Sequence, residues 1–134
     1  YKMYPDFFRD VRVRVVGLIP RMELVRVMSA SNFFVFPSLA EGSARVIFMA
    51  LTCGCYVITT KNSGSVVVDS THGKIVEAGN VEQLSLAISD SMQLSHDYLN
   101  SVQEKNYEYI KKNYTTENYR LNLVKIYDVL NNVL

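Results

Sequence analysis

The feature that most constrains the fold is a pair of short apolar runs, each ending in a turn that leads into a helical pattern. Phe33–Phe36 is apolar on both faces, and Pro37 and Ser38 end it. Tyr56–Thr60 follows a helical pattern at Glu41–Cys53, which Gly54 stops. Runs that are apolar on both faces fit strands buried in a parallel sheet. The repeated alternation of strand and helix therefore predicts an α/β fold with flanking helices.

Further elements are expected on either side of this pair. Strands are expected at Val11–Val16 and Lys74–Val76, helices from Pro20 to about Ser31 and at Val81–Leu94, Asp97–Tyr114 and Thr116–Leu134, and a short helical segment at Val66–Val68. The helices are expected to turn these apolar side chains inward: Met22, Leu24, Val25, Met28, Val46, Ile47, Ala50, Leu51, Leu84, Ala87, Ile88, Met92, Tyr119, Leu123, Ile126, Tyr127, Leu130 and Leu134. Residues 1–134 are thus expected to form one domain, with 81–134 mostly helical.

Composition excludes several classes of protein. The 134 residues are 49% hydrophobic with a net charge of +1, which is an ordinary globular balance. The N-terminal part is locally basic, and we interpret its arginines as a solvated surface rather than a nucleic-acid site: Arg9, Arg12, Arg14, Arg21 and Arg26. The longest apolar stretches are too short to span a membrane.

Cysteine and histidine give no metal or redox motif. Cys53 and Cys55 are separated by one residue, a spacing that suits neither a C-x-x-C motif nor a zinc site. We expect free thiols in a reducing compartment, with Cys53 a buried, inert thiol that ends a helix in an apolar setting. His72 and His96 are far apart in the sequence and are expected at the surface.

Two turns occupy the position where ligands bind in an open parallel sheet, beyond the carboxyl ends of the strands. The first, Pro37–Ser43, carries the carboxylate of Glu41 at the start of a helix. The second, Thr59–Val66, contains Gly64, which allows close backbone approach, and free N–H groups there would bind an anion. A carboxylate loop beside an anion loop suits a ligand with hydroxyls and phosphates, such as a nucleotide sugar.

A plainer interpretation of both turns remains open. Glu41 could simply cap its helix, and Gly64 could simply turn the chain. Neither loop contains a P-loop or a G-x-G-x-x-G fingerprint.

A set of segments in register resembles the donor-binding domain of group 1 glycosyltransferases, which have the GT-B fold. The resemblance spans roughly residues 11–90 and rests on Val15–Pro20, Glu23-Leu24, Phe33–Ser38, Glu41–Ala44, Ala50–Gly54, Val57–Thr60, Asn62–Val67, Asp69 and Gly73. It implies that the chain is the C-terminal, nucleotide-sugar-binding half of a fold that joins two Rossmann-like domains across a cleft. The domain would be incomplete here, with a helical C-terminal tail.

The resemblance also implies roles for single residues. Glu41 would contact hydroxyls of the donor sugar and stabilise positive charge at the anomeric carbon. The donor would further be held by Gly42, Ser43 and Ala44 at the sugar, by Gly64, Ser65 and Val66 at the diphosphate, and by Met49, Asn62 and Ser63, with Leu18, Ile19 and Pro20 near the nucleobase. No metal and no cofactor besides the donor substrate are implied.

The sequence departs from the family pattern in three ways. Met49 stands eight positions after Glu41, where the family has a second glutamate that holds the donor ribose. Tyr56 replaces a proline before the strand at Val57. The basic residues that bind the diphosphate in the family would lie upstream of Tyr1.

The implied function is transfer of a sugar from a nucleotide donor to a glycan or lipid-linked acceptor. The acceptor would be held mainly by an N-terminal domain outside this chain, in the cytoplasm or, through the full-length protein, at the inner face of the membrane. A catalytically degenerate binding or scaffold subunit is the alternative, and a receiver-like switch domain is a weaker one, because no acidic cluster is visible.

The family sheet has the strand order 3-2-1-4-5-6, so Val11–Val16 is not expected to pair with Phe33–Phe36.

Overall fold

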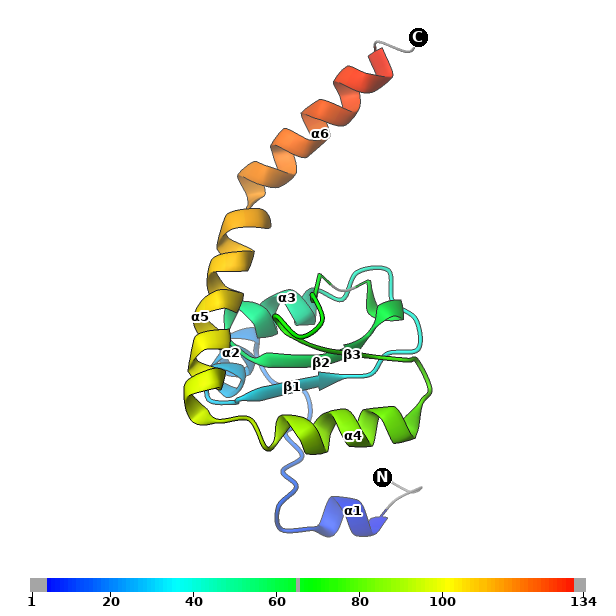
Figure 1. The fold of residues 1–134 in the computed structure, drawn as a ribbon, viewed down its shortest axis with the longest axis vertical. Coiled ribbons are helices and arrows are strands. Elements are labelled where there is room, and N and C mark those ends of the chain that lie inside the picture. Colours follow the sequence, from blue (N-terminus) through cyan, green and yellow to red (C-terminus); the bar gives the residue numbers. More distant parts are fainter. Residues whose placement is uncertain (1–4, 65, 132–134) are drawn as a thin grey trace.

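Three parallel strands form a sheet at the centre of the fold (Figure 1). The structure is a computed structural model that describes residues 5–64 and 66–131. The strands β1 (Phe33–Phe36), β2 (Tyr56–Thr60) and β3 (Gly73–Val76) are hydrogen-bonded in that order. All five residues of β2 are buried, as expected of a central strand covered on both faces. The predicted α/β fold with a parallel sheet and flanking helices is confirmed.

Helices lie on both faces of this sheet. The described helices are α1 (Pro5–Arg9), α2 (Arg21–Ser29), α3 (Arg45–Thr52), α4 (Val81–Ser91), α5 (His96–Asn113) and α6 (Thr116–Asn131), with a 3-10 turn, η1 (Lys61–Ser63), and α2 to α5 form the packed layers. On one face, Ile47 and Leu51 of α3 pack on Val57 together with α2. On the other face, α4 packs on the sheet around Ile58. Helix α5 packs against the apolar side chains of both faces, because it crosses the end of the sheet where the strands begin (Figure 1). The opposite edge, at the carboxyl ends, is left to loops.

The segment Val11–Val16 is not a strand, contrary to the sequence prediction. It forms a turn and irregular backbone, and Val11 is 99% exposed. Among the described residues no strand lies beside it to accept its backbone hydrogen bonds, and an isolated strand is unstable without them. The expectation that this segment does not pair with β1 is confirmed, since the sheet of the described residues consists of β1, β2 and β3 alone. The arginines around it are exposed, as expected.

One expected helix boundary and one expected helical segment are wrong. Helix α3 begins at Arg45, not at Glu41, so the loop before it is longer than expected. Residues 66–68 are irregular, and the helical turn in that loop is η1 instead. The sequence also placed Met22 and Met92 inward, whereas both are largely exposed. Met22 lies in the first turn of α2, and Met92 follows the last residue of α4.

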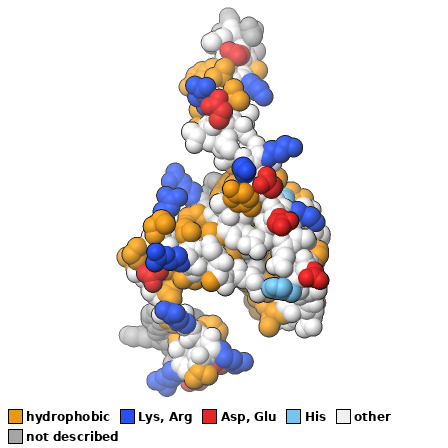
Figure 2. Space-filling model, turned by 90° about the vertical axis from the view of Figure 1, so that its left-hand side faces the viewer, with side chains coloured by type: hydrophobic (Ala, Val, Ile, Leu, Met, Phe, Trp, Pro, Cys, Tyr) orange, Lys and Arg blue, Asp and Glu red, His pale blue; other side chains and the backbone are white. Residues whose placement is uncertain are grey.

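Helix α6 is the largest departure from the predicted packing. It extends away from the sheet (Figure 1), and orange side chains lie exposed along it in Figure 2. Tyr119, Ile126 and Tyr127, expected in the core, are more than half exposed, and Leu123 is half-buried. Leu134 and the side chain of Leu130 lie outside the described residues. The apolar spacing was correct, but the described chain provides no surface for this face. None of the described helices is long and apolar enough to cross a membrane.

Candidate functional site

Two loops at the carboxyl ends of β1 and β2 carry the residues that the sequence singled out. We call residues 37–44 the glutamate loop and residues 61–66 the glycine loop. Ser65 of the glycine loop lies outside the described residues. Both loops lie at the edge of the sheet opposite to α5, where ligands bind in open parallel sheets (Figure 1).

Backbone hydrogen bonds hold the two loops together. The N–H of Glu41 donates to the carbonyl of Asn62 at 2.7 Å, and the N–H of Ala44 donates to the carbonyl of Ser63 at 3.3 Å. The side-chain amide of Asn62 donates to the carbonyl of Leu39 at 3.1 Å. Glutamate and glycine loops therefore form one surface.

Buried hydroxyls tie this surface to the sheet. Thr60 donates to the carbonyl of Ser38 at 2.6 Å, and Thr59 donates to that of Phe36 at 2.9 Å. The hydroxyl of Ser63 donates to the carbonyl of Thr60 at 2.7 Å and lies 3.0 Å from the hydroxyl of Thr59. All three side chains are almost completely buried. The supporting role of the threonines was not predicted from the sequence, although polar residues at the end of a buried strand were the available signal.

Gly64 is required where the loops meet. Its φ is +59°, in the left-handed region that favours glycine. A Cβ there would lie 2.3 Å from the carbonyl oxygen of Gly42 and 3.1 Å from Cα of Ser43. The sequence predicted that Gly64 allows a ligand to approach the backbone closely, but in the structure the glutamate loop makes this close approach.

Glu41 presents a carboxylate that has no partner among the residues that the structure describes. Its backbone is fixed by Asn62, while its side chain is exposed and forms no hydrogen bond or ion pair with any described residue. It lies four positions before Arg45, where α3 begins, so the interpretation of Glu41 as a simple helix cap is wrong. Four acceptor positions of the carboxylate remain open to hydroxyl donors.

The other residues that are predicted to contact the donor differ in their exposure and in the hydrogen bonds that they already make. Gly42 and Ser43 are exposed beside Glu41, whereas the N–H of Ala44 is already occupied by Ser63. The side chain of Ser63 is buried, which leaves it a supporting role. Met49 is half-buried and packs against the core cluster of α2 and α3. Leu18, Ile19 and Pro20 lie in the irregular segment before α2, and no hydrogen bond among the described residues joins them to either loop.

Two cavities adjoin the loops. The larger, about 550 Å³, is lined by Lys61, Asn62, Asp69, Ile75, Glu77 and Gln83. The smaller, about 160 Å³, lies between Leu39 and the start of α4. Asp69 accepts the N–H of Ile75 at 2.8 Å, which fixes the turn before β3. A third cavity, of about 470 Å³, lies between α3 and α5 and is lined by Thr52 and Gln103, away from both loops.

His72 is buried, contrary to the expectation of a surface residue. It is 5% exposed because α5 packs over the turn before β3, and its Nδ1 lies 2.8 Å from Oδ1 of Asn106. His96 is exposed at the start of α5, as expected. Cys53 and Cys55 are free thiols, but Cys53 is only half-buried, contrary to the expectation of a buried thiol. Burial raises the pKa of Cys55 to about 11. In the described ranges no group of three or more His, Cys, Asp or Glu side chains could hold a metal ion.

Comparisons with known proteins agree with this arrangement. The chain is 28% identical over 85 residues to the O-antigen chain mannosyltransferase B of Escherichia coli, a match that covers 63% of this chain and 22% of that protein. Its fold superposes on sucrose-phosphate synthase from Thermosynechococcus elongatus with a TM-score of 0.81 at 23% identity, over 99% of this chain and 34% of the synthase. The chain thus spans only about a third of the synthase and less than a quarter of the mannosyltransferase.

The family model described as "Glycosyl transferases group 1" matches residues 6–93. That range covers more than half of the chain and includes the strands, the paired loops and all of α4. The three-stranded parallel sheet with its flanking helices is a Rossmann-like part of the GT-B fold. On this match, the chain belongs to the group 1 glycosyltransferase family.

Proposed function

We propose that the paired loops bind a nucleotide-diphosphate sugar and that the intact protein transfers the sugar to an acceptor. The observation that carries the proposal is the combination at Glu41 of a fixed backbone and an exposed carboxylate without a partner among the described residues. The glycine loop lies directly against the next two residues, Gly42 and Ser43. A carboxylate beside a backbone-lined turn suits a ligand that carries hydroxyls at one end and phosphates at the other.

In this proposal each part of the surface has a separate task. The carboxylate of Glu41 accepts hydrogen bonds from hydroxyls of the donor sugar and stabilises positive charge that develops at the anomeric carbon. Backbone N–H groups of Gly42 and Ser43 lie against the sugar, and those of Gly64, Ser65 and Val66 hold the diphosphate. The bonds between the loops set this geometry before the donor arrives, which is the condition for electrostatic stabilisation of a transition state.

The acceptor and the rest of the protein complete the proposal. We assign the acceptor, a glycan or a lipid-linked saccharide, mainly to an N-terminal domain outside residues 1–134. The name of the mannosyltransferase relative supports a glycan-building role. We propose action in the cytoplasm, with the inner face of the membrane as the alternative location.

Calorimetric titration of the intact protein with a panel of nucleotide sugars tests the proposal. We expect one donor to bind, and Glu41→Gln to retain binding of the matching nucleoside diphosphate while transfer of the sugar is lost. No detectable binding of any nucleotide sugar would overturn the proposal.

A second candidate function is a degenerate binding or scaffold subunit. The packing of Met49 favours it, because an apolar side chain occupies the position where the family has its second glutamate. Donor binding without any transfer to a range of acceptors would support this candidate over the first.

A further inference from the structure

A tyrosine of α5 reaches the glycine loop. The hydroxyl of Tyr109 lies 3.1 Å from the carbonyl oxygen of Val66 and 3.2 Å from the hydroxyl of Tyr114. A carbonyl can only accept, so Tyr109 donates to Val66, and Tyr114 is left to donate to Tyr109. The two hydroxyls form a short chain that ends on the loop.

This contact fixes the glycine loop at its second end. At the first end, the side chain of Ser63 is completely buried, and its hydroxyl donates a hydrogen bond to the carbonyl of Thr60. The backbone carbonyl of Ser63 accepts a hydrogen bond from the N–H of Ala44. Gly64 directly follows the first of these fixed points, and the carbonyl of Val66 is the second. The backbone orientation of Gly64 and of Val66 therefore depends on Ser63 and on Tyr109.

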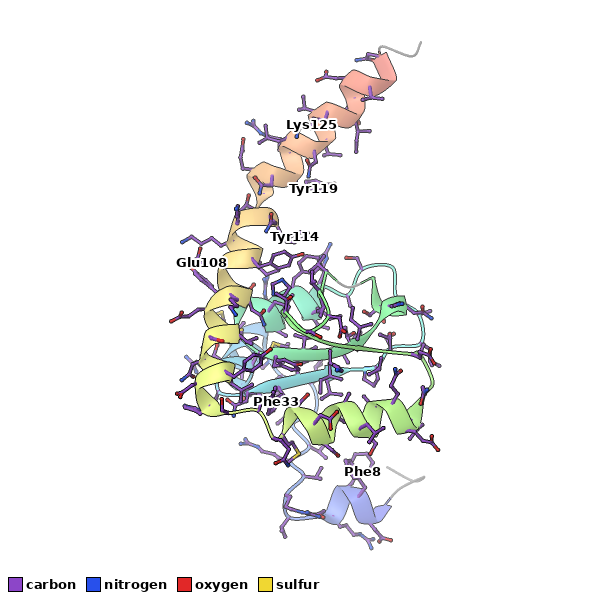
Figure 3. The ribbon with its side chains drawn as sticks, viewed as in Figure 1. Phe8, Phe33, Glu108, Tyr114, Tyr119 and Lys125 are labelled. Atoms are coloured by element: carbon purple, nitrogen blue, oxygen red, sulfur yellow. The ribbon has the colours of Figure 1, made fainter. Side chains whose placement is uncertain are left out.

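Tyr109 is itself held in place. Its ring stacks on that of His72 at a centroid distance of 4.0 Å. His72 is bonded to Asn106, whose amide nitrogen donates to the carbonyl of Cys55 at 2.8 Å, so Oδ1 of Asn106 accepts and Nδ1 of His72 carries the hydrogen. Tyr114, at the end of α5 (Figure 3), contacts the ring of Phe48 in α3 edge-on.

We propose that Tyr109 is a positioning residue for the donor, whose hydroxyl holds the glycine loop in the conformation that binds a diphosphate. The inference rests on the proposed function and adds to it a residue of α5 that lies outside the resemblance. Burial, with Tyr114 as a second cause, raises the pKa of Tyr109 to about 12. Its hydroxyl therefore keeps its proton and remains a donor at neutral pH.

The test compares two variants of the intact protein. Tyr109→Phe removes the hydroxyl and keeps the ring that stacks on His72. Tyr107→Phe is the matched control, because Tyr107 is exposed on the same helix and its ring faces the ammonium of Lys111 rather than the loop. Each variant is titrated by calorimetry with UDP, GDP and ADP and with the matching monophosphates.

We expect Tyr109→Phe to raise the Kd of the bound diphosphate about three- to tenfold, the scale of one net hydrogen bond, with little change for the monophosphate. The melting temperature should match that of Tyr107→Phe, and hydrogen exchange over residues 61–68 should accelerate. Tyr114→Phe, which leaves the bond from Tyr109 to Val66 in place, should give a smaller loss.

Equal diphosphate affinity in Tyr109→Phe and Tyr107→Phe would overturn the role of Tyr109 and leave the proposed function standing. Equal losses for diphosphate and monophosphate, together with a lower melting temperature, would also overturn it, since they indicate a purely structural tyrosine. If the parent protein binds none of the nucleotides, the proposed function fails, and the role of Tyr109 fails with it.

Discussion

The backbone of Gly64 approaches that of Gly42 so closely that a Cβ at position 64 would lie 2.3 Å from the Gly42 carbonyl oxygen. The same glycine adopts a left-handed φ of +59°. Two requirements, a left-handed turn and contact between two loops, thus fall on one residue. Loss of this glycine would separate the loops before it affected any ligand directly.

Gly64→Ala should therefore lower the free energy of unfolding and weaken diphosphate binding together. We expect a loss of about 2–4 kcal/mol, from the left-handed conformation and the displacement of packed backbone. Urea denaturation measures the first effect, and titration with a nucleoside diphosphate measures the second.

Gly17 and Gly42 provide controls that separate the two causes. Gly17 has a φ of +62° with no atom of a described residue within 4 Å of its Cβ position, so Gly17→Ala should cost only about 1–2 kcal/mol. Gly42 has the same open space with respect to the described chain and no left-handed φ, and its alanine variant should unfold like the parent. A cost for Gly64→Ala no larger than that for Gly17→Ala would show that the loop contact contributes nothing.

Glu41→Gln should reduce turnover by orders of magnitude without affecting the fold. The carboxylate has no partner among the described residues, so its loss breaks no bond within the structure. Removal of one preorganised electrostatic group costs roughly 2–4 kcal/mol in transition-state stabilisation. Steady-state kinetics of the intact protein measures the loss, with Glu23→Gln on the exposed side of α2 as the control. Unchanged turnover in Glu41→Gln would remove the catalytic role.

Met49→Glu tests whether the missing family carboxylate can be restored. The resemblance alone predicts tighter binding of a ribose-containing donor. The packing of Met49 against the core cluster predicts instead a loss of about 1–3 kcal/mol in the free energy of unfolding, which we expect to dominate. Met49→Leu, which conserves volume, should be close to neutral. Tighter donor binding at unchanged stability would contradict this expectation and the degenerate alternative.

Stability should fall at alkaline pH because of Cys55. Burial, followed by the neighbouring Cys53, raises the pKa of Cys55 to about 11 from its ordinary 9.0, so the folded state favours the neutral thiol. This contribution is complete below about pH 9 and is lost as the pH rises toward 11. Tyr109, with a pKa of about 12, acts in the same direction at higher pH.

Urea midpoints measured from pH 8 to pH 11 should therefore decline, and less steeply in Cys55→Ala. The alanine variant will be less stable overall, so the comparison concerns the slope and not the level. Equal slopes in the parent and the variant would assign the decline to other groups.

The sequence predicted the parts of the fold that local pattern determines. Phe33–Phe36 and Tyr56–Thr60 are strands at the predicted bounds because apolar runs of this length fit a covered sheet. Val11–Val16 shows the limit of that reasoning, since a strand also needs a neighbour to bond with. The position of Glu41 at the sheet edge was predicted, but the start of α3 at Arg45 was not.

Long-range contacts account for what the sequence did not reveal at the site. The bond between Tyr109 and Val66 joins residues 43 positions apart, and no local pattern marks it. His72 is buried by α5, which follows much later in the chain. Roles that depend on which helix covers which loop require the tertiary structure.

The exposed face of α6 gives the last prediction. Tyr119, Leu123, Ile126 and Tyr127 recur at helical spacing on one side, and three of the four are more than half exposed. Residues 1–134 expressed alone should therefore associate, because so much apolar surface is rarely left free in water. Light scattering after size exclusion should detect dimers or larger species, and the double variant Ile126→Ser, Tyr127→Ser should shift them toward monomer.

The control variant Leu121→Ser, on the other side of α6, should leave association unchanged. The resemblance assigns this face to the N-terminal domain of the intact protein, where the double variant should lower the melting temperature. A parent chain that is monomeric at all concentrations would contradict the prediction.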